Sequence, residues 1–180
     1  MAEQLMEISD ASEADEIENL YLTFEAEKET YAVNISHVTE IVGMQRISAM
    51  PDVPDFIKGA MNLRGKVIPV MDVRLRFGLP ERAYDDRTTI IVLDLDGTPT
   101  GLVVDKVTDV LTILPESIEP PPQWHGKSKT KEKDDKNPQG IIKGLGKHGD
   151  SVSIILDIPR LLSIDLPAAI LNKPEPENSK

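Results

Sequence analysis

Residues 56–74 read FIKGAMNLRGKVIPVMDVR, and they contain the clearest fold signal in the chain. Two apolar runs flank the tetrapeptide NLRG at 62–65, in which Gly65 gives the backbone freedom that a tight turn needs. The stretch therefore predicts a β-hairpin. Pro69 has no backbone N–H, so it predicts that the second strand is an edge strand or carries a bulge.

The same texture extends in both directions along the chain. Alternating apolar residues predict a hairpin over 20–35, and the turn DLDGTP at 94–99 predicts another between 88–95 and 101–107. Further strands are expected at 110–114, 141–145 and 152–156, and short helices near 72–77 and 158–162. The stretch 34–42 fits either a helix or a strand, and we favour a short helix that runs into a strand near Ile41. Many short strands with Gly and Pro turns indicate an all-β barrel architecture with short helices.

The ends of the chain and one internal stretch differ from this pattern. Residues 1–18 hold seven acids and no Lys or Arg, which predicts a disordered acidic leader. Residues 127–139 read KSKTKEKDDKNPQ and contain no apolar side chain, so we expect a flexible charged loop. The folded domain is expected to span 19–168, followed by a flexible tail at 169–180.

Composition excludes several classes of function. The chain has 20 Lys and Arg against 31 Asp and Glu, and this net charge of −11 argues against nucleic-acid binding. Without the leader the charge is about −4, so we expect partner contacts to depend on apolar surface more than on long-range attraction. Aromatic residues make up only 4% of the chain, which argues against a stacking cofactor site.

The cysteine and histidine content argues against a metal centre. The chain has no Cys, and His37, His125 and His148 lie in separate segments without the spacing of metal ligands. We therefore expect no metal and no cofactor. The chain also carries neither a signal-peptide pattern nor an apolar stretch long enough to span a bilayer, so we expect a cytoplasmic protein without direct membrane insertion.

One enzymatic alternative comes from the sequence IIVLDLDGT at 90–98. An apolar strand followed by Asp-x-Asp-Gly-Thr is typical of haloacid-dehalogenase-type phosphatases, in which Asp94 would be the nucleophile and Asp96 the acid and base. That site needs a helix after the loop, whereas the sequence returns at once as another strand. Since Asp-Gly also favours tight turns, we prefer a hairpin turn and no catalysis.

Two side chains are candidates for partner contacts. Arg64, beside a tight turn, would hold its guanidinium out toward a partner; alternatively it forms a salt bridge with Glu40 or Asp72 within the chain. Trp124, the single Trp, follows three prolines. It is either an exposed interface anchor or packed against the end of the barrel.

Read in order, these segments resemble the CheW family of bacterial chemotaxis adaptors. The likeness runs from near Leu20 to Ser163 and is strongest in FIKGAMNLRGKVIPVMDVR; YAVNISHVTEIVG and TTIIVLDLDGTPTGLVVDKVTDVLTI also contribute. It implies two interleaved five-stranded barrels of Src-homology-3-like type. It further implies a scaffold without catalysis that couples the cytoplasmic tip of methyl-accepting chemoreceptors to the regulatory domain of the histidine kinase CheA.

The resemblance also implies where the partners bind and how the chain behaves. The positions that match receptor-binding sites are Glu40, Arg64, Ile90 and Val110. Those that match kinase-binding sites are Val38, Val42, Met44 and Ile47, and those that match the second kinase contact in rings are Glu119 and Trp124. We expect a monomer when free, recruited to membrane-associated receptor arrays. A CheW-like adaptor of a non-chemotaxis array is the alternative.

Overall fold

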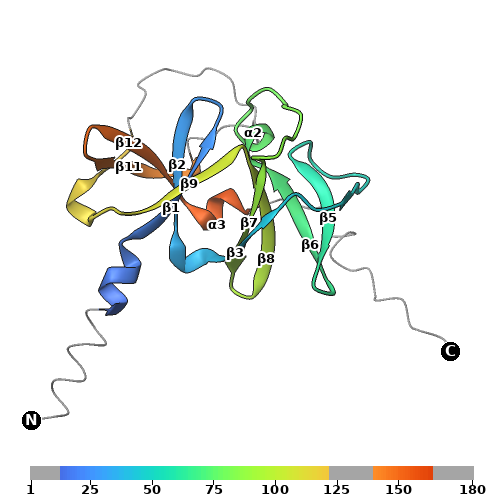
Figure 1. Cartoon of the computed structure of the whole chain (residues 1–180), viewed down its shortest axis with the longest axis horizontal. Coiled ribbons are helices and arrows are strands. Elements are labelled where there is room, and N and C mark those ends of the chain that lie inside the picture. The colour runs from blue at the N-terminus through green and yellow to red at the C-terminus, as the bar shows by residue number, and fades with distance from the viewer. Residues whose placement is uncertain (1–12, 122–139, 164–180) are drawn as a thin grey trace, which may run out of the picture.

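Two six-stranded β-sheets form the fold in the computed structural model, which describes residues 13–121 and 140–163 (Figure 1). The first sheet has the order β10-β11-β12-β2-β1-β9 and the second the order β3-β7-β8-β6-β5-β4. The first consists of β1 (Leu20–Ala26), β2 (Glu29–Asn34), β9 (Lys106–Thr112), β10 (Ile118–Glu119), β11 (Ile142–His148) and β12 (Ser151–Leu156). The second consists of β3 (Val38–Gly43), β4 (Ile47–Ser48), β5 (Ile57–Leu63), β6 (Lys66–Asp72), β7 (Thr89–Leu95) and β8 (Thr98–Val104).

This architecture confirms the all-β prediction. Each sheet has five strands of six or seven residues and one two-residue strand at its edge, and the second sheet lies in sequence between the two halves of the first. The helices are short, as expected: η1 (Ile35–His37), α2 (Val73–Arg76), η2 (Pro115–Ser117) and α3 (Ile158–Leu161). Asp72 and Asp157 start α2 and α3, because each side chain accepts hydrogen bonds from the first backbone N–H groups of its helix.

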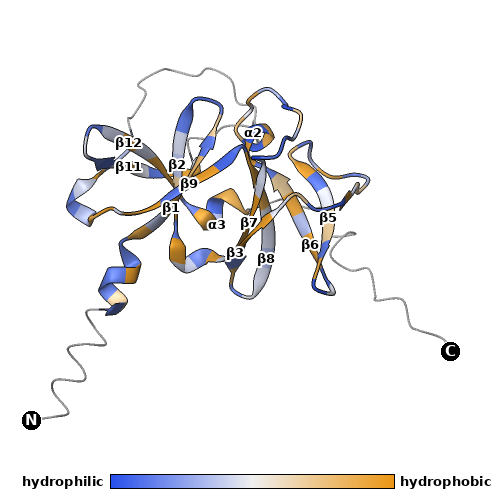
Figure 2. Ribbon diagram, viewed as in Figure 1, coloured by the Kyte–Doolittle hydropathy of each residue, from blue (hydrophilic) through white to orange (hydrophobic). Residues whose placement is uncertain are grey.

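The largest apolar core joins the two sheets. Phe24 of the first sheet and Leu93 of the second are completely buried in it, together with Leu161 of α3. Arg76 of α2 lies in the same region, where its guanidinium donates to the carbonyl of Leu161 at 3.2 Å and covers the ring of Phe56. Figure 2 shows the hydrophobic residues along the central strands and α3, while the hairpin tips are hydrophilic.

The chain folds as two copies of one unit, a relationship that our sequence reasoning missed. The hairpins β5–β6 and β11–β12 both have an irregular register after their first residue, at Ile57/Gly59 and at Ile142/Gly144. Each hairpin then pairs in parallel with a strand of a second hairpin, through Val70 with Gly101 and through Ile155 with Ala32. Positions 57–76 therefore correspond to positions 142–161, and positions 20–42 correspond to positions 89–111.

Two glycines mark equivalent close approaches in the two units. A Cβ atom on Gly59 would lie 2.0 Å from the carbonyl oxygen of Ser48, and one on Gly144 would lie 2.7 Å from that of Glu119. Ser48 and Glu119 belong to the two-residue edge strands β4 and β10. Only glycine lets the backbones pass this closely, and the motif Ile-Lys-Gly at 57–59 and 142–144 is the visible trace of the repeat.

Three sequence predictions need correction. Strand β6 is interior rather than an edge; Pro69 is tolerated because the ladder to β8 begins one residue later, at Val70. The strand predicted over 101–107 ends at Val104, and Val107 belongs to β9. Residues 13–18 of the expected leader are helical with exposed side chains, and the amide of Asn19 donates to the carbonyl of Asp15 at their end. Residues 1–12 lie outside the described residues.

Candidate functional site

Arg64 and Glu40 form an exposed ion pair at the edge of the second sheet. Arg64 lies in the β5–β6 turn with a φ of 53°, and its side chain is 78% exposed. Its guanidinium meets the Glu40 carboxylate at 2.9 and 3.3 Å. Of the alternatives for Arg64, the salt bridge within the chain is therefore the one observed, and its acceptor is Glu40. Asp72 instead accepts from the start of α2 and from the hydroxyl of Tyr84.

Strand β3 alternates between a half-buried and an exposed face. Val38, Glu40 and Val42 lie on the half-buried face, and Ile41 on the other face is 45% exposed. The segment predicted to contact the kinase divides between two cores. Val38 packs against the large core, whereas Val42, Met44 and Ile47 pack against a smaller one formed by β5, β6, β7 and β8.

Ile90 requires a correction, because it offers no surface to a partner. Its side chain is completely buried in the smaller core, and its Cα pairs with that of Val42 across β3 and β7. A direct receptor contact by Ile90 is thus inconsistent with the structure. The four consecutive apolar residues of TIIVLDL are the sequence signal for this burial, because an interior strand covered on both faces has no polar face.

Val110 lies on β9, the edge strand of the first sheet, and is 43% exposed. In the repeat it corresponds to Ile41, because Glu40 pairs with Val92 in one unit and Asp109 pairs with Thr23 in the other. The structure therefore puts an acid followed by an exposed branched apolar residue on an edge strand of each sheet. The similar strings VTEIV at 38–42 and VTDVL at 107–111 are the sequence signal that could have shown this.

Of the two residues matched to the second kinase contact, the structure describes Glu119 but not Trp124. Glu119 lies on β10 and forms an exposed ion pair with Lys147 of β11. Trp124 and the charged loop at 127–139 lie outside the described residues. The choice between an exposed and a packed Trp124 therefore stays open.

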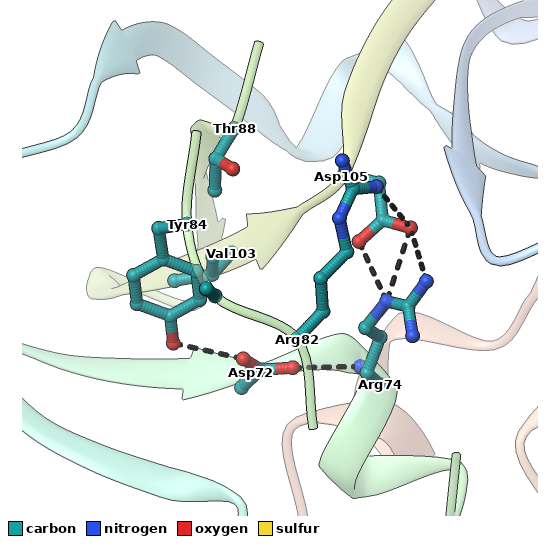
Figure 3. Close-up of a pocket in the computed structure, with 8 residues that line it drawn as sticks. Asp72, Arg74, Arg82, Tyr84, Thr88, Val103 and Asp105 are labelled. Carbon is teal, nitrogen blue, oxygen red and sulfur yellow. Dashed lines mark hydrogen bonds and ion pairs between the residues drawn. The ribbon is translucent and has the colours of Figure 1, made fainter. Parts of the chain in front are cut away.

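A polar network that the sequence did not predict lies between α2 and the segment before β7 (Figure 3). The guanidinium of Arg74 meets both carboxylate oxygens of Asp105 at 2.8 to 3.0 Å, with both side chains almost buried. Burial by itself raises the pKa of Asp105, but hydrogen bonds from Arg74 and from the backbone of Glu27 outweigh it and lower the pKa. The hydroxyl of Tyr84 donates to Asp72 at 2.8 Å, and burial followed by this hydrogen bond raises the pKa of Tyr84.

Asp94 and Asp96 lie in a hairpin turn, as preferred above. Strands β7 and β8 are antiparallel across it, and the Asp94 carboxylate accepts from the backbone N–H of Gly97 at 2.8 Å. Asp96 has a φ of 52°, the left-handed conformation that Asp-Gly turns adopt. No helix follows the loop, so the phosphatase alternative is wrong for this geometry.

Neither a group of metal-binding side chains nor a membrane-spanning helix is found in residues 13–121 and 140–163. Within them, no three His, Asp or Glu side chains are grouped so that they could hold a metal ion. In the same part of the chain, no helix has the length and apolar character to cross a membrane.

Comparison with known proteins identifies the family. The model of the CheW-like domain matches residues 20–165, which include both sheets and α3. The chain belongs to the CheW family. It is 36% identical to the chemotaxis protein CheW of Klebsiella aerogenes over 152 residues, covering 84% of this chain and 86% of that protein. It is 28% identical to the Helicobacter pylori protein of the same name over 165 residues, covering 91% and 94%.

A solved structure of this family has the same architecture. The scaffolding protein TtCheW from Thermoanaerobacter tengcongensis superposes with a TM-score of 0.69 and 33% sequence identity. The alignment covers 82% of this chain and 94% of TtCheW. The CheW-like domain therefore accounts for nearly all of the described residues, including the Arg64–Glu40 pair and the edge strands β3 and β9.

Proposed function

We propose that this chain is a non-catalytic scaffold that couples chemoreceptors to the histidine kinase CheA. The observation that carries the proposal is the CheW-like domain over residues 20–165, together with relatives named as chemotaxis proteins and a solved relative named as a scaffolding protein. The antiparallel turn at Asp94 and Asp96 supports a role without catalysis. The proposed setting is the cytoplasm, at membrane-associated receptor arrays, with a monomeric chain when free.

The receptor surface in this proposal contains Glu40, Arg64 and Val110. A helical receptor tip has an apolar stripe with polar residues beside it. In the proposed complex the stripe contacts Val110, and the polar residues contact the Arg64–Glu40 ion pair. Ile90 keeps a supporting role, because it packs under Val42 and so fixes the position of β3 beside Glu40.

The kinase surface in this proposal is the segment with Val38, Val42, Met44 and Ile47, which binds the regulatory domain. These four side chains are partly buried: Val38 packs against the large core and the other three against the smaller one, so a bound kinase domain would extend both cores. Glu119 and Trp124 are proposed for the second kinase contact in rings. Lys147 must then share Glu119 with the kinase, since the two residues are paired here.

A pull-down of the full chain tests the proposal. Purified CheA regulatory domain and a cytoplasmic receptor fragment are the two baits, and we expect each to retain the chain. Failure to bind either bait would refute the proposal. Magnesium-dependent phosphatase activity that is lost in Asp94→Asn would instead point to the enzyme.

A further inference from the structure

The two structural repeats differ in the region above the aspartate that starts each short helix. In the second sheet this aspartate is Asp72, and the segment after α2 turns back across it. Tyr84 donates its hydroxyl to Asp72, and the carbonyl of Pro80 accepts from Arg74 at 2.9 Å. We call residues 78–88 the strap. Figure 3 shows the strap with Tyr84 above Asp72 and Arg82 directed to Asp105.

Among the described residues, the equivalent place in the first sheet is a cavity; the positions that correspond to most of the strap, 164–173, lie outside the described residues. The volume of the cavity is about 240 Å³, whereas the space left beneath the strap is about 10 Å³. Asp157 lines the cavity at the position that corresponds to Asp72 beneath the strap, and Asn34 lines it at the position that corresponds to Val103. The lining is mixed: Tyr21 and Ile155 offer aromatic and apolar surface, whereas His37 is polar.

The residues that fix the strap have no counterparts around the cavity. Pro159 stands at the position of Arg74, and Ser36 at the position of Asp105. The bidentate pair that holds the strap is therefore missing on this side. In the described part of the chain, the cavity keeps the acceptor Asp157 but has neither the arginine nor the aspartate of the pair that holds the strap.

The residues that recognise the strap, in contrast, are kept. Lys58 donates to Glu81 of the strap at 2.6 Å, and the equivalent residue Lys143 lines the cavity. Within the described ranges the structure records no ion pair for Lys143. The carboxylate of Asp157 accepts from the backbone N–H of Arg160 at 3.0 Å, and the Arg160 guanidinium lies 4.0 Å away. The cavity thus offers an ammonium group and a carboxylate at the positions equivalent to Lys58 and Asp72, the two residues that hold Glu81 and Tyr84 of the strap.

We propose that this cavity is a docking site for a partner protein segment of the form Glu-x-x-Tyr. The acid pairs with Lys143, the phenol donates to Asp157, and the ring packs on Tyr21 and Ile155. Two observations define this occupant: the positive charge of Lys143, and the equivalent site in the second sheet, which Glu81 and Tyr84 of the strap occupy. The inference is independent of the receptor and kinase surfaces proposed above, because none of their described residues lines the cavity.

A peptide copying the strap tests the proposal. Its sequence is GLPERAYDDRT, and a fluorescent label allows its binding to the full chain to be followed by anisotropy. We expect saturable binding, with amide shifts in nuclear magnetic resonance spectra at Tyr21, His37 and Ile155. Lys143→Glu in the chain should weaken binding about tenfold, and Glu81→Lys in the peptide should restore it. Lys66→Glu, on an exposed hairpin tip, is the control and should leave affinity unchanged.

The other occupants would be recognised by different results. Binding that does not saturate, that is the same for the Tyr84→Phe peptide, or that shifts amides of the second sheet overturns the proposal. A large gain in peptide affinity on Leu171→Asp would assign the cavity to the segment after α3 instead. A dimer of the chain that the peptide dissociates would assign it to a second copy. Pull-down by the kinase and receptor baits is unaffected by any of these results.

Discussion

The guanidinium of Arg64 lies 2.9 Å from the carboxylate of Glu40 while remaining mostly exposed to solvent. Arg64 is on a turn with a positive φ, and Glu40 is on the half-buried face of an edge strand. The pair therefore holds a charged group in a fixed direction without removing it from solvent. Exposed ion pairs contribute at most about 1 kcal/mol to stability, so this geometry suits recognition better than folding.

Arg64→Ala should weaken binding of the receptor fragment about tenfold and leave the fold intact. The guanidinium is lost from the proposed interface, whereas no buried contact is lost. Isothermal titration calorimetry measures the affinity, and circular dichroism measures the melting temperature, which should change by no more than about 2 °C. Lys66→Ala on the same hairpin is the control, and receptor affinity equal to that of the unmodified chain in Arg64→Ala would remove Arg64 from the site.

Val110→Ser should also weaken receptor binding, by about threefold to tenfold. A half-exposed valine that becomes covered in the complex contributes on the order of 1 kcal/mol through its apolar surface. Val67→Ser provides a matched control, because Val67 is a valine with 74% exposure on the β5–β6 hairpin. If both substitutions weaken binding equally in the same calorimetric titration, Val110 has no special role.

Arg74→Ala should destabilise the fold by up to about 3 kcal/mol, because the almost buried Asp105 carboxylate loses its bidentate partner and keeps the more distant Arg82, at 3.6 Å. Urea unfolding followed by circular dichroism measures the loss. Arg87→Ala, which removes a largely exposed guanidinium, is the control and should change stability by less than about 1 kcal/mol. A similar small effect for Arg74→Ala would show that the pair is not structural.

The stability of the fold should fall at acidic pH through Asp105. Its pKa is lowered in the folded chain, so the stabilisation is fully present above the pKa of the unfolded state, about 3.9, and is lost as pH falls through the lower folded value. Urea midpoints measured from pH 7 to pH 2.5 should show this loss. Asp105→Asn should be less stable at pH 7 and show a smaller decrease below pH 4; an unchanged decrease would assign the acid sensitivity to other carboxylates.

Tyr84→Phe should lower the free energy of unfolding by about 1 to 2 kcal/mol, because the hydroxyl that donates to the buried Asp72 carboxylate is lost. The raised pKa of Tyr84 gives a second readout: in an alkaline absorbance titration its ionisation should come above the ordinary pKa of about 10. The difference between the chain and Tyr84→Phe isolates this residue. An ionisation near 10 in that difference would contradict the hydrogen bond.

Residues 56–74 predicted a hairpin without further information, since two apolar runs around Asn-Leu-Arg-Gly have few other ways to satisfy their backbone groups. The same reasoning correctly gave the turn at Asp94 to Gly97, the short helices and the all-β class. These features depend on contacts between residues close in sequence. The order of the segments also carried the family resemblance, and through it the expected partners.

Other features were decided by residues that meet only in the folded chain. The sequence left Arg64 with two possible acids; the approach of β3 to the β5–β6 turn decided for Glu40. The sequence left Ile90 as a candidate for a receptor contact, but the fold covers both faces of β7 and buries it. The strap with Tyr84, and the cavity at the equivalent place, depend on segments far apart in sequence, such as β2 and β12, which pair through Ala32 and Ile155. Local sequence determined the hairpins because neighbouring residues form them, whereas burial, ion pairing and the cavity are set by long-range packing.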